Sequence, residues 1–177
     1  LNHFDKRAVL TYLDRMADAI EKRTGPLRDH IRAFFIDGLE LEGANWTGDM
    51  RDEFIRRRGY DPMPYLPFTM YKTGGMGNVL DYHYGAAMTP EFQDTIERVR
   101  YDFCLTQAEL LDERFFKPFT DWTHSRGVIS RVQAYGRGTF PLTSSLYCDI
   151  PEEVTHFTDT LERAIEIGDC KLYRLSA

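Results

Sequence analysis

The chain has 177 residues, of which 42% are hydrophobic and 14% aromatic, and 22 basic against 28 acidic residues give it a formal net charge of −6. This apolar content is enough for a packed core, which excludes an intrinsically disordered chain. The sequence lacks the basic stripe of a nucleic-acid-binding protein, and no apolar run approaches the length of a membrane span. We therefore expect a globular domain that binds neither nucleic acid nor membrane.

Cysteine and histidine form no recognisable metal or disulfide pattern. The three cysteines, Cys104, Cys148 and Cys170, are widely spaced without a C-x-x-C pair, so no structural zinc site is expected. We interpret them as free, buried thiols. The five histidines show neither H-x-x-H nor H-E-x-x-H spacing, which argues against a metal hydrolase built on histidines.

The N-terminal part predicts a helix followed by a strand. Asp5 is a potential N-cap, and apolar side chains then recur at three- and four-residue spacing up to Ile20, as on one face of a helix. Gly25 and the proline after it end that helix. Residues 31–36 (IRAFFI) are short and apolar, which predicts a strand buried on both faces, as in a parallel sheet.

A second helix is expected after Thr47, its predicted N-cap, and ends at Gly59. The basic run 56–58 lies on this helix and is interpreted as a solvated face. Residues 61–67 (DPMPYLP) contain three prolines, which predicts an extended, stiff stretch. Residues 72–88 predict a long glycine-rich loop. The side chains expected to face the core from this helix are Met50, Phe54 and Ile55.

A third helix begins at residues 89–91 (Thr-Pro-Glu), which combine a cap, a first-turn proline and an acid at the positive end of the helix. The helical pattern continues to about residue 125, with Pro118 as a kink or a restart. Gly127 ends it. Residues 128–135 (VISRVQAY) predict a second strand, and residues 146–150 a short third one.

Strands thus alternate with helices, and residues from 158 onward predict a last helix. Such alternation implies parallel strands joined by right-handed crossover helices. A closed barrel takes about 250 residues, whereas this chain predicts two clear strands and one short one. The predicted fold class is therefore α/β, part of a (β/α)8 TIM-type barrel that is incomplete in this chain. Residues 1–177 are expected to form a single fragment of that catalytic domain.

Acidic side chains follow the predicted strands, where the active groups of parallel α/β proteins gather. Two separated carboxylate clusters with aromatic residues nearby are typical of glycoside hydrolysis. One carboxylic acid protonates the leaving oxygen, and a second carboxylate activates water or attacks the sugar. On position alone, each acid is equally explained as a helix cap, a surface charge or a turn-shaping residue. The acids are Asp37, Glu40, Glu42, Asp149, Glu152 and Glu153.

Arg131 and Gln133 alternate along the second predicted strand and therefore share one face. If that face lines the lumen of a barrel, both are site residues. If it faces helices, both are buried polar groups that need partners. The lumen interpretation costs less free energy. Trp46 also has two interpretations, an apolar staple at a helix start and a platform for a sugar ring.

Several motifs resemble the calcium-dependent α-L-rhamnosidases, glycoside hydrolase family 106. Members of that family show a D-S-Y-E block, an N-W-T and an R-R-G-Y-D with prolines, in the order seen here. The matching runs are FFIDGLELEGANWT (34–47), FIRRRGYDPMPYLP (54–67), ERFFKPFTDWTHSRGVISRVQAYG (113–136) and DIPEE (149–153). The resemblance implies inverting hydrolysis of terminal α-L-rhamnosyl residues on a catalytic (β/α)8 barrel, with a calcium ion that holds sugar hydroxyls.

The same resemblance implies roles for individual residues. Glu40 falls at the glutamate of the D-S-Y-E block and would be the general acid, although Glu42, two positions on, leaves that assignment ambiguous. Glu152 falls at the glutamate of I-P-E and would be a calcium ligand or the second catalytic carboxylate. A departure from the pattern precedes Glu40, where Gly and Leu replace Ser and Tyr. The residues expected around the sugar are Asn45, Trp46, Arg131, Gln133 and Tyr135.

Two other functions fit the residues. One is a retaining barrel hydrolase, such as a β-galactosidase-like enzyme, with its two carboxylates closer together. The other is a non-catalytic carbohydrate-binding domain. In the rhamnosidase interpretation the expected partners are an oligosaccharide or rhamnosylated glycoconjugate and the remainder of the parent chain, without which the fragment is expected to be inactive. The resemblance further implies a bacterial protein that is periplasmic or secreted.

Overall fold

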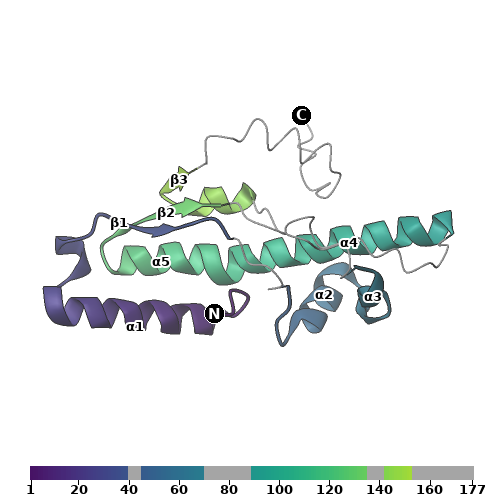
Figure 1. Cartoon of the computed structure of the whole chain (residues 1–177), viewed down its shortest axis with the longest axis horizontal. Helices are drawn as coiled ribbons and strands as arrows, with labels where there is room; N and C mark the ends of the chain where they lie inside the picture. Colours follow the sequence, from purple (N-terminus) through teal and green to yellow (C-terminus); the bar gives the residue numbers. More distant parts are fainter. Residues whose placement is uncertain (40–44, 70–88, 135–141, 153–177) are drawn as a thin grey trace, which may run out of the picture. The chain divides into compact units, whose positions relative to one another are not determined.

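The computed structural model of the chain describes residues 1–39, 45–69, 89–134 and 142–152 (Figure 1). The chain divides into two compact units. The first unit comprises residues 1–47 and 107–154, and the second unit comprises residues 48–106 and 155–177. The predicted loop 72–88 and the predicted last helix lie outside the described residues. Among the described residues, none of the helices has the length and apolar character needed to cross a membrane.

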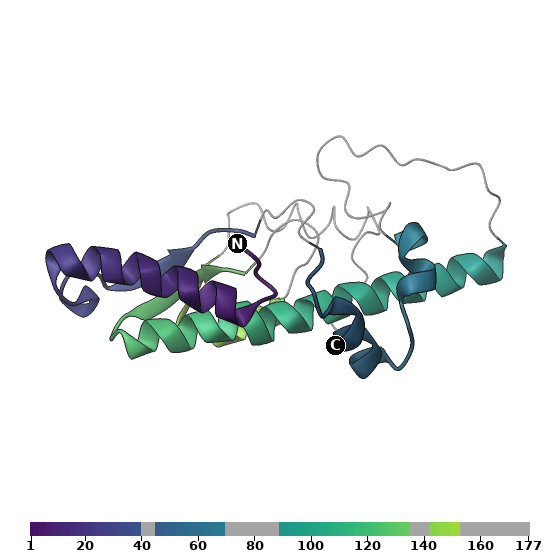
Figure 2. The same ribbon diagram turned by 90° about the horizontal axis from the view of Figure 1, so that it is seen from below.

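A three-stranded parallel sheet organises the first unit. Its strands are β1 (Ala33–Ile36), β2 (Ile129–Gln133) and β3 (Ile150–Glu152), in the order β1-β2-β3. Helix α5 (Lys117–Ser125) packs on one face of this sheet, and helix α1 (Lys6–Thr24) runs beside α5 (Figures 1 and 2). The predicted α/β class with parallel strands is confirmed for these three strands.

Helix α1 begins and ends where its sequence predicts. The Asp5 carboxylate accepts hydrogen bonds from the backbone N–H groups of Arg7 and Ala8, at 2.9 and 3.2 Å, which satisfies two donors of the first turn. At the other end, Gly25 has a φ of 87°, a conformation that suits glycine. The apolar stripe faces inward, with Val9, Leu13 and Ala17 buried.

A long helical stretch leads into the sheet, as the sequence predicts. Helix α4 (Pro90–Leu111) continues through a π-helical segment (Asp112–Phe116) into α5. The Thr89 hydroxyl caps α4 by accepting a hydrogen bond from the N–H of Phe92 at 3.3 Å. The π-helical segment lies directly before Pro118, which has no N–H and whose ring crowds the carbonyl four residues earlier. The widened turn accommodates that crowding, so the stretch continues instead of stopping.

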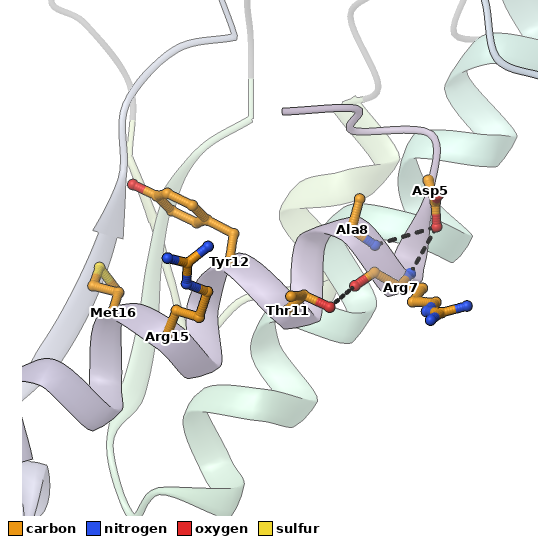
Figure 3. A pocket seen from close by; sticks show the side chains of 7 residues that line it. All are labelled: Asp5, Arg7, Ala8, Thr11, Tyr12, Arg15 and Met16. Atoms are coloured by element: carbon orange, nitrogen blue, oxygen red, sulfur yellow. Dashed lines mark hydrogen bonds between the residues drawn. The ribbon is translucent and has the colours of Figure 1, made fainter.

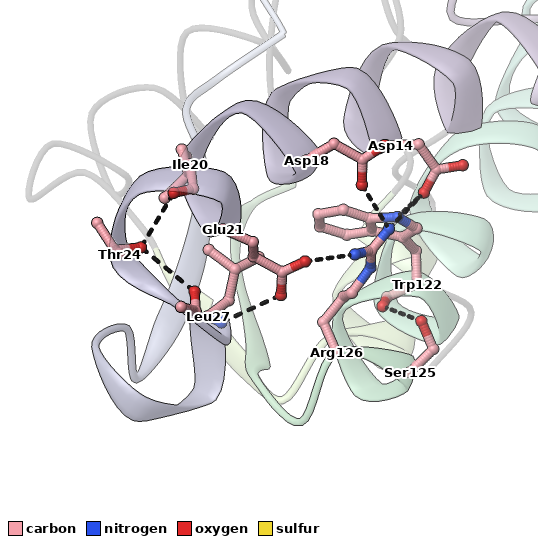
Figure 4. Close-up of polar contacts among 10 residues, drawn as sticks. Asp14, Asp18, Ile20, Glu21, Thr24, Leu27, Trp122, Ser125 and Arg126 are labelled. Atoms are coloured by element: carbon pink, nitrogen blue, oxygen red, sulfur yellow. Dashed lines mark hydrogen bonds and ion pairs between the residues drawn. The ribbon is translucent and has the colours of Figure 1, made fainter.

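Arg126, after the end of α5, ties that helix to α1 (Figure 4). Its guanidinium lies 2.8 Å from the Glu21 carboxylate and 2.9 Å from that of Asp14, with Asp18 at 3.7 Å. The Trp122 indole N–H donates to Asp14 at 2.9 Å, and the guanidinium carbon lies 5.6 Å from the centroid of the Trp122 ring. Helix α1 is therefore fixed through three acids on one of its faces.

In the second unit, helix α2 (Met50–Arg58) ends at Gly59, as predicted, with a φ of 83°. Met50 and Phe54 are fully buried, whereas Ile55 is only half-buried. The Phe54 ring lies 5.0 Å from that of Tyr60, and the Tyr60 hydroxyl donates to the Asp102 carboxylate at 2.8 Å. These contacts pack α2 against α4.

Two predictions about α2 are wrong. Its N-cap position is held by Asp49, because the Thr47 hydroxyl is buried and accepts a hydrogen bond from Asn2 at 3.0 Å. The basic run is not a uniformly solvated face. The Arg56 side chain is 61% exposed, but that of Arg57 is 10% exposed and paired with Glu53.

Residues 63–67 are helical, so the prediction of an extended stretch over 61–67 is wrong. They form a 3₁₀ turn (Met63–Tyr65) and the start of α3 (Leu66–Thr69). Asp61 accepts a hydrogen bond from the N–H of Met63 at 3.1 Å. Proline is tolerated in a first helical turn because the N–H that it lacks has no partner there.

Two strand predictions also need correction. Residues 142–147 form a 3₁₀ helix (Leu142–Tyr147), so β3 begins at Ile150 and the predicted strand start at 146 is wrong. Strand β1 is not buried on both faces. Phe34 packs against Trp122 of α5, but the Phe35 side chain is 46% exposed on the other face. Among the described residues, helices cover only the face of Phe34.

Gly127 provides a test of the helix-to-strand turn. Its φ is +71°, and an added Cβ would lie 3.2 Å from Cβ of Arg28. Gly127→Ala is therefore expected to lower the free energy of unfolding by about 1–2 kcal/mol, as measured by urea denaturation. Gly48→Ala is the matched control, because an added Cβ there meets nothing within 4 Å. Equal effects of the two substitutions would contradict this account.

Candidate functional site

The two faces of strand β2 have different chemistry. Ser130 and Val132 are buried, and the Thr120 hydroxyl of α5 donates to Ser130 Oγ at 3.0 Å. Arg131 is exposed and Gln133 half-buried on the opposite face, because side chains alternate along a strand. Arg131 and Gln133 thus share a face, as their spacing predicts, and that face points away from α5.

Three strands each contribute one side chain to a cluster on this open face. The Arg131 guanidinium of β2 forms an ion pair with the Glu152 carboxylate of β3. The same guanidinium lies over the Phe35 ring of β1, 5.0 Å from its centroid. The Arg131 and Glu152 side chains are 47% and 23% exposed. An ion pair this exposed contributes only about 0–1 kcal/mol to stability, so its main effect is to orient the carboxylate. We call Phe35, Arg131 and Glu152 the open-face cluster.

Gln133 connects the open-face cluster to the segment that follows β1. Its side-chain oxygen accepts a hydrogen bond from the backbone N–H of Gly38 at 3.3 Å, and its register partner in β3 is Glu152. The Asp37 carboxylate accepts from the same N–H at 2.8 Å, which supports its interpretation as a turn-shaping residue. Gln133 therefore helps to fix the direction in which the chain leaves β1 at Gly38.

The remaining predicted site residues stand apart from this set. Glu40 and Tyr135 lie outside the described residues. The backbone carbonyl of Asn45 accepts a hydrogen bond from the Gln107 side chain at 2.9 Å, so Asn45 is anchored to α4. The Trp46 side chain is 41% exposed. The structure thus brings together Arg131, Gln133 and Glu152. It also adds Phe35, which sequence reasoning missed because β1 was predicted to be buried on both faces.

Asp149 has more contacts than a turn-shaping residue needs. Its Oδ2 atom accepts hydrogen bonds from the N–H of Ser130 at 2.7 Å and from the Ser130 hydroxyl at 2.8 Å. His124 Nε2 of α5 lies 2.8 Å from the same oxygen. Burial raises the pKa of Asp149, but the hydrogen bonds from Ser130 and His124 outweigh it and hold that pKa below its ordinary value. No local sequence signal indicates this, since the three residues meet only in the fold.

The described residues by themselves do not fit a calcium ion. Calcium takes six to eight oxygen ligands, whereas residues 1–39, 45–69, 89–134 and 142–152 contain no group of three or more histidine, cysteine, aspartate or glutamate side chains that could hold a metal. Glu152 is the one predicted ligand among them, and its carboxylate is already paired with Arg131. Any further ligands would have to come from residues outside this part.

The cysteines of the described part are ordinary thiols. Cys104 and Cys148 are free and half-buried, and burial raises the pKa of both thiols. A raised pKa keeps a thiol protonated and unreactive at neutral pH. Their interpretation as free cysteines is confirmed, whereas Cys170 lies outside the described residues.

The described surface includes a hollow along α1 and another at the sheet. One follows a single face of α1 (Figure 3), and its polar contacts are local, such as the Thr11 hydroxyl that donates to the Arg7 carbonyl at 2.8 Å. It is lined by Asp5, Arg7, Ala8, Thr11, Tyr12, Arg15 and Met16. The other hollow lies at the amino-terminal part of the sheet and is lined by His30, Ile31, Arg32, Ala33, Arg131 and Ile150. Only the second hollow reaches the open-face cluster, through Arg131.

The open-face cluster thus places a carboxylate, an arginine and an aromatic ring on one face of a parallel α/β sheet. The profile of the alpha-L-rhamnosidase family, glycoside hydrolase family 106, matches residues 1–154. The chain therefore belongs to the alpha-L-rhamnosidase family, which confirms the resemblance carried by its motifs.

Two relatives illustrate this membership. The solved structure of a rhamnosidase from Novosphingobium sp. PP1Y is similar to this chain, with a TM-score of 0.56 and 26% identity, over 78% of this chain and 12% of that protein. A putative beta-glucuronidase from Formosa agariphila is 29% identical over 100 residues, which is 56% of this chain and 7% of that protein. The chain thus spans about a tenth of the length of each of these relatives.

The Asp149 carboxylate predicts a pH dependence of stability. Because its pKa is lower in the folded state, the unfolded state binds more protons near pH 4, and stability rises with pH. The contribution is complete above the ordinary aspartate pKa of about 3.9 and is lost as the pH falls through the lower folded value. The free energies of unfolding of the protein and its Asp149→Asn variant should therefore differ more at pH 5 than at pH 3. A difference that is independent of pH would contradict this assignment.

Proposed function

We propose that this chain is an internal part of the catalytic barrel of an α-L-rhamnosidase that removes terminal α-L-rhamnosyl residues with inversion. Family membership and the likeness to a solved rhamnosidase support rhamnose as the sugar that is released. The observation that carries the proposal is the open-face cluster, on the side of a parallel sheet away from α5. In a (β/α)8 barrel the helices lie outside, so this face would be the lumen. Residues 1–177 would then be one fragment of a single catalytic domain.

The two carboxylates would divide the chemistry between them. Inverting hydrolysis needs one protonated acid at the leaving oxygen and one ionised carboxylate that activates water on the opposite side, about 6.5–9.5 Å away. Glu152 is paired with Arg131, and a carboxylate that a guanidinium holds in one orientation suits the water-activating role. Glu40, four residues after the last residue of β1 in the sequence, is then the general acid, with Glu42 as the alternative.

The remaining site residues would bind the sugar. The exposed indole of Trp46 is suited to the apolar C–H face of a sugar ring, and Asn45, Arg131, Gln133 and Tyr135 offer polar groups for its hydroxyls. The strands missing from the barrel would come from the parent chain, so the isolated chain is expected to be inactive. The ligand is an oligosaccharide or glycoconjugate ending in rhamnose, and the expected location is the periplasm or the exterior of a bacterium.

Calcium, which the family resemblance implies, is part of the proposal. Glu152 is the candidate ligand among the described residues, and it has one carboxylate oxygen besides the atom that meets Arg131. A bound calcium ion would supply a fixed positive charge that coordinates sugar hydroxyls. Glu152 thus has two alternative roles, metal ligand and water-activating carboxylate.

Glu40→Gln in the parent enzyme tests the acid. Loss of a general acid lowers the rate by about 10²–10⁴-fold, so kcat/KM on an unactivated rhamnoside should fall by that range. Glu42→Gln is the matched control and should retain activity, and a calcium chelator should abolish release by the unsubstituted enzyme. Full activity of the Glu40 variant with loss in the Glu42 variant would reverse the assignment. Activity that the chelator leaves unchanged would contradict the proposed role of calcium.

The anomer of the first product tests the stereochemical outcome. Inversion at an α-L-rhamnoside releases β-L-rhamnose, which proton NMR distinguishes from the α-anomer before mutarotation. Release of the α-anomer would instead support a retaining hydrolase with carboxylates about 5–5.5 Å apart. The similarity to a putative beta-glucuronidase makes β-glucuronides a second candidate substrate class. Cleavage of glucuronides or galactosides in preference to rhamnosides would overturn the proposed sugar.

A further inference from the structure

Asp149, the residue before β3, joins β3 to β2 through its side chain as well as its backbone. Its Oδ2 atom accepts hydrogen bonds from the N–H and the hydroxyl of Ser130, and its own N–H donates to Ser130 Oγ at 3.0 Å. One residue further on, Arg131 and Ile150 form the first pair of the ladder. The Asp149 side chain therefore extends the pairing of the two strands by one residue.

The hydroxyl of Ser130 is fully used in this arrangement. A hydroxyl has one donor and two acceptor positions. Ser130 donates to the Asp149 carboxylate and accepts from the Asp149 N–H and from the Thr120 hydroxyl. Ser130 is completely buried and Thr120 is 7% exposed, so water cannot replace a lost partner. Because a buried polar group without a partner is unfavourable, one position of Asp149 is strongly preferred.

Helix α5 holds the Asp149 carboxylate from its other side. His124 Nε2 lies 3.0 Å from Oδ1 and 2.8 Å from Oδ2 of Asp149. His124 and Thr120 lie four residues apart on α5, so they lie on the same side of that helix. The segment that enters β3 is thus fixed to both β2 and α5.

Strand β3 needs this support because its own ladder is weak. It has three residues, Ile150–Glu152, and its central residue, Pro151, has no N–H to donate to a neighbouring strand. A strand this short specifies its register poorly by backbone hydrogen bonds alone. The contacts of Asp149 therefore contribute much of what fixes the register of β3.

We propose that Asp149 is a positioning residue, which fixes the register of β3 and thereby places Glu152 beside Arg131 and Gln133. This inference rests on the proposed function, in which Glu152 acts on the substrate or its metal. A slip of one residue would turn Glu152 toward α5, because side chains alternate along a strand. A slip of two residues would move its carboxylate by about 6.6 Å along the sheet.

The test compares variants of the parent enzyme on an α-L-rhamnoside. Asp149→Ala removes every side-chain contact, and because a misplacement of about 1 Å can cost 10²-fold, kcat should fall by about 10²-fold or more, with a smaller change in KM. Asp149→Asn keeps an oxygen that can accept from Ser130 and should restore most of kcat. Asp121→Ala is the matched control. Asp121 is an exposed acid on α5, the helix that carries Thr120 and His124, and its substitution should leave kcat unchanged.

The folded fraction of each variant separates a displaced carboxylate from a partly unfolded enzyme. Circular dichroism gives that fraction, and a displaced Glu152 lowers kcat per folded molecule, whereas partial unfolding lowers only the number of active molecules. If Asp149→Ala does not fold, Ser130→Ala replaces it, because this variant loses the hydroxyl but keeps the N–H. It should show a smaller fall in kcat per folded molecule.

The outcomes distinguish this inference from the proposed function. An active parent enzyme whose folded Asp149→Ala or Ser130→Ala variant keeps its kcat would overturn the inference alone. A folded parent enzyme that cleaves no glycoside would overturn the proposed function and, with it, the role of Asp149 in catalysis. A fall in kcat per folded molecule in Asp149→Ala with a smaller change in KM, and its rescue in Asp149→Asn, would support both.

Discussion

The first unit depends on the pairing of strand β2 with neighbours on both sides. Parallel pairing sets β1 and β3 in register with β2, so Phe35, Arg131 and Ile150 lie in one row across the sheet. Alternation along β2 then separates two kinds of surface. Ser130 and Val132 are buried toward the helices, whereas Arg131 and Gln133 remain on the open face. Every candidate functional residue that the structure brings together owes its place to this register.

Electrostatic contacts at the two ends of β3 have different effects. Near its start, the Asp149 carboxylate accepts hydrogen bonds from a buried serine and from the backbone, so it contributes mainly to the position of the strand. At its end, the Glu152 carboxylate meets an exposed arginine that in turn lies over Phe35. Charge at a surface site contributes little to stability, but a carboxylate held in one orientation is what hydrolysis of a glycosidic bond requires.

Helix α5 supports both ends of this arrangement. It follows the π-helical segment Asp112–Phe116. From α5, Thr120 and His124 meet the β2–β3 junction, while Trp122 packs against Phe34 of β1. Arg126, just beyond the helix, joins it to three acids of α1. The open face is thus backed by a layer that is fixed at several points.

The sequence by itself determined the helices with strong local signals, the α/β class, the parallel strands and the family. Asp5, Thr89 and Gly127 act locally, through caps and a turn, so their effects can be predicted from short stretches of sequence. The shared face of Arg131 and Gln133 follows from alternation in one strand.

Tertiary structure alone decided which polar groups meet. Thr47 is a buried acceptor instead of a cap because Asn2 reaches it. Asp149 is a bridge because Ser130 and His124 converge on it. Contacts between residues far apart in the chain depend on the register and packing of whole elements, which no local pattern specifies.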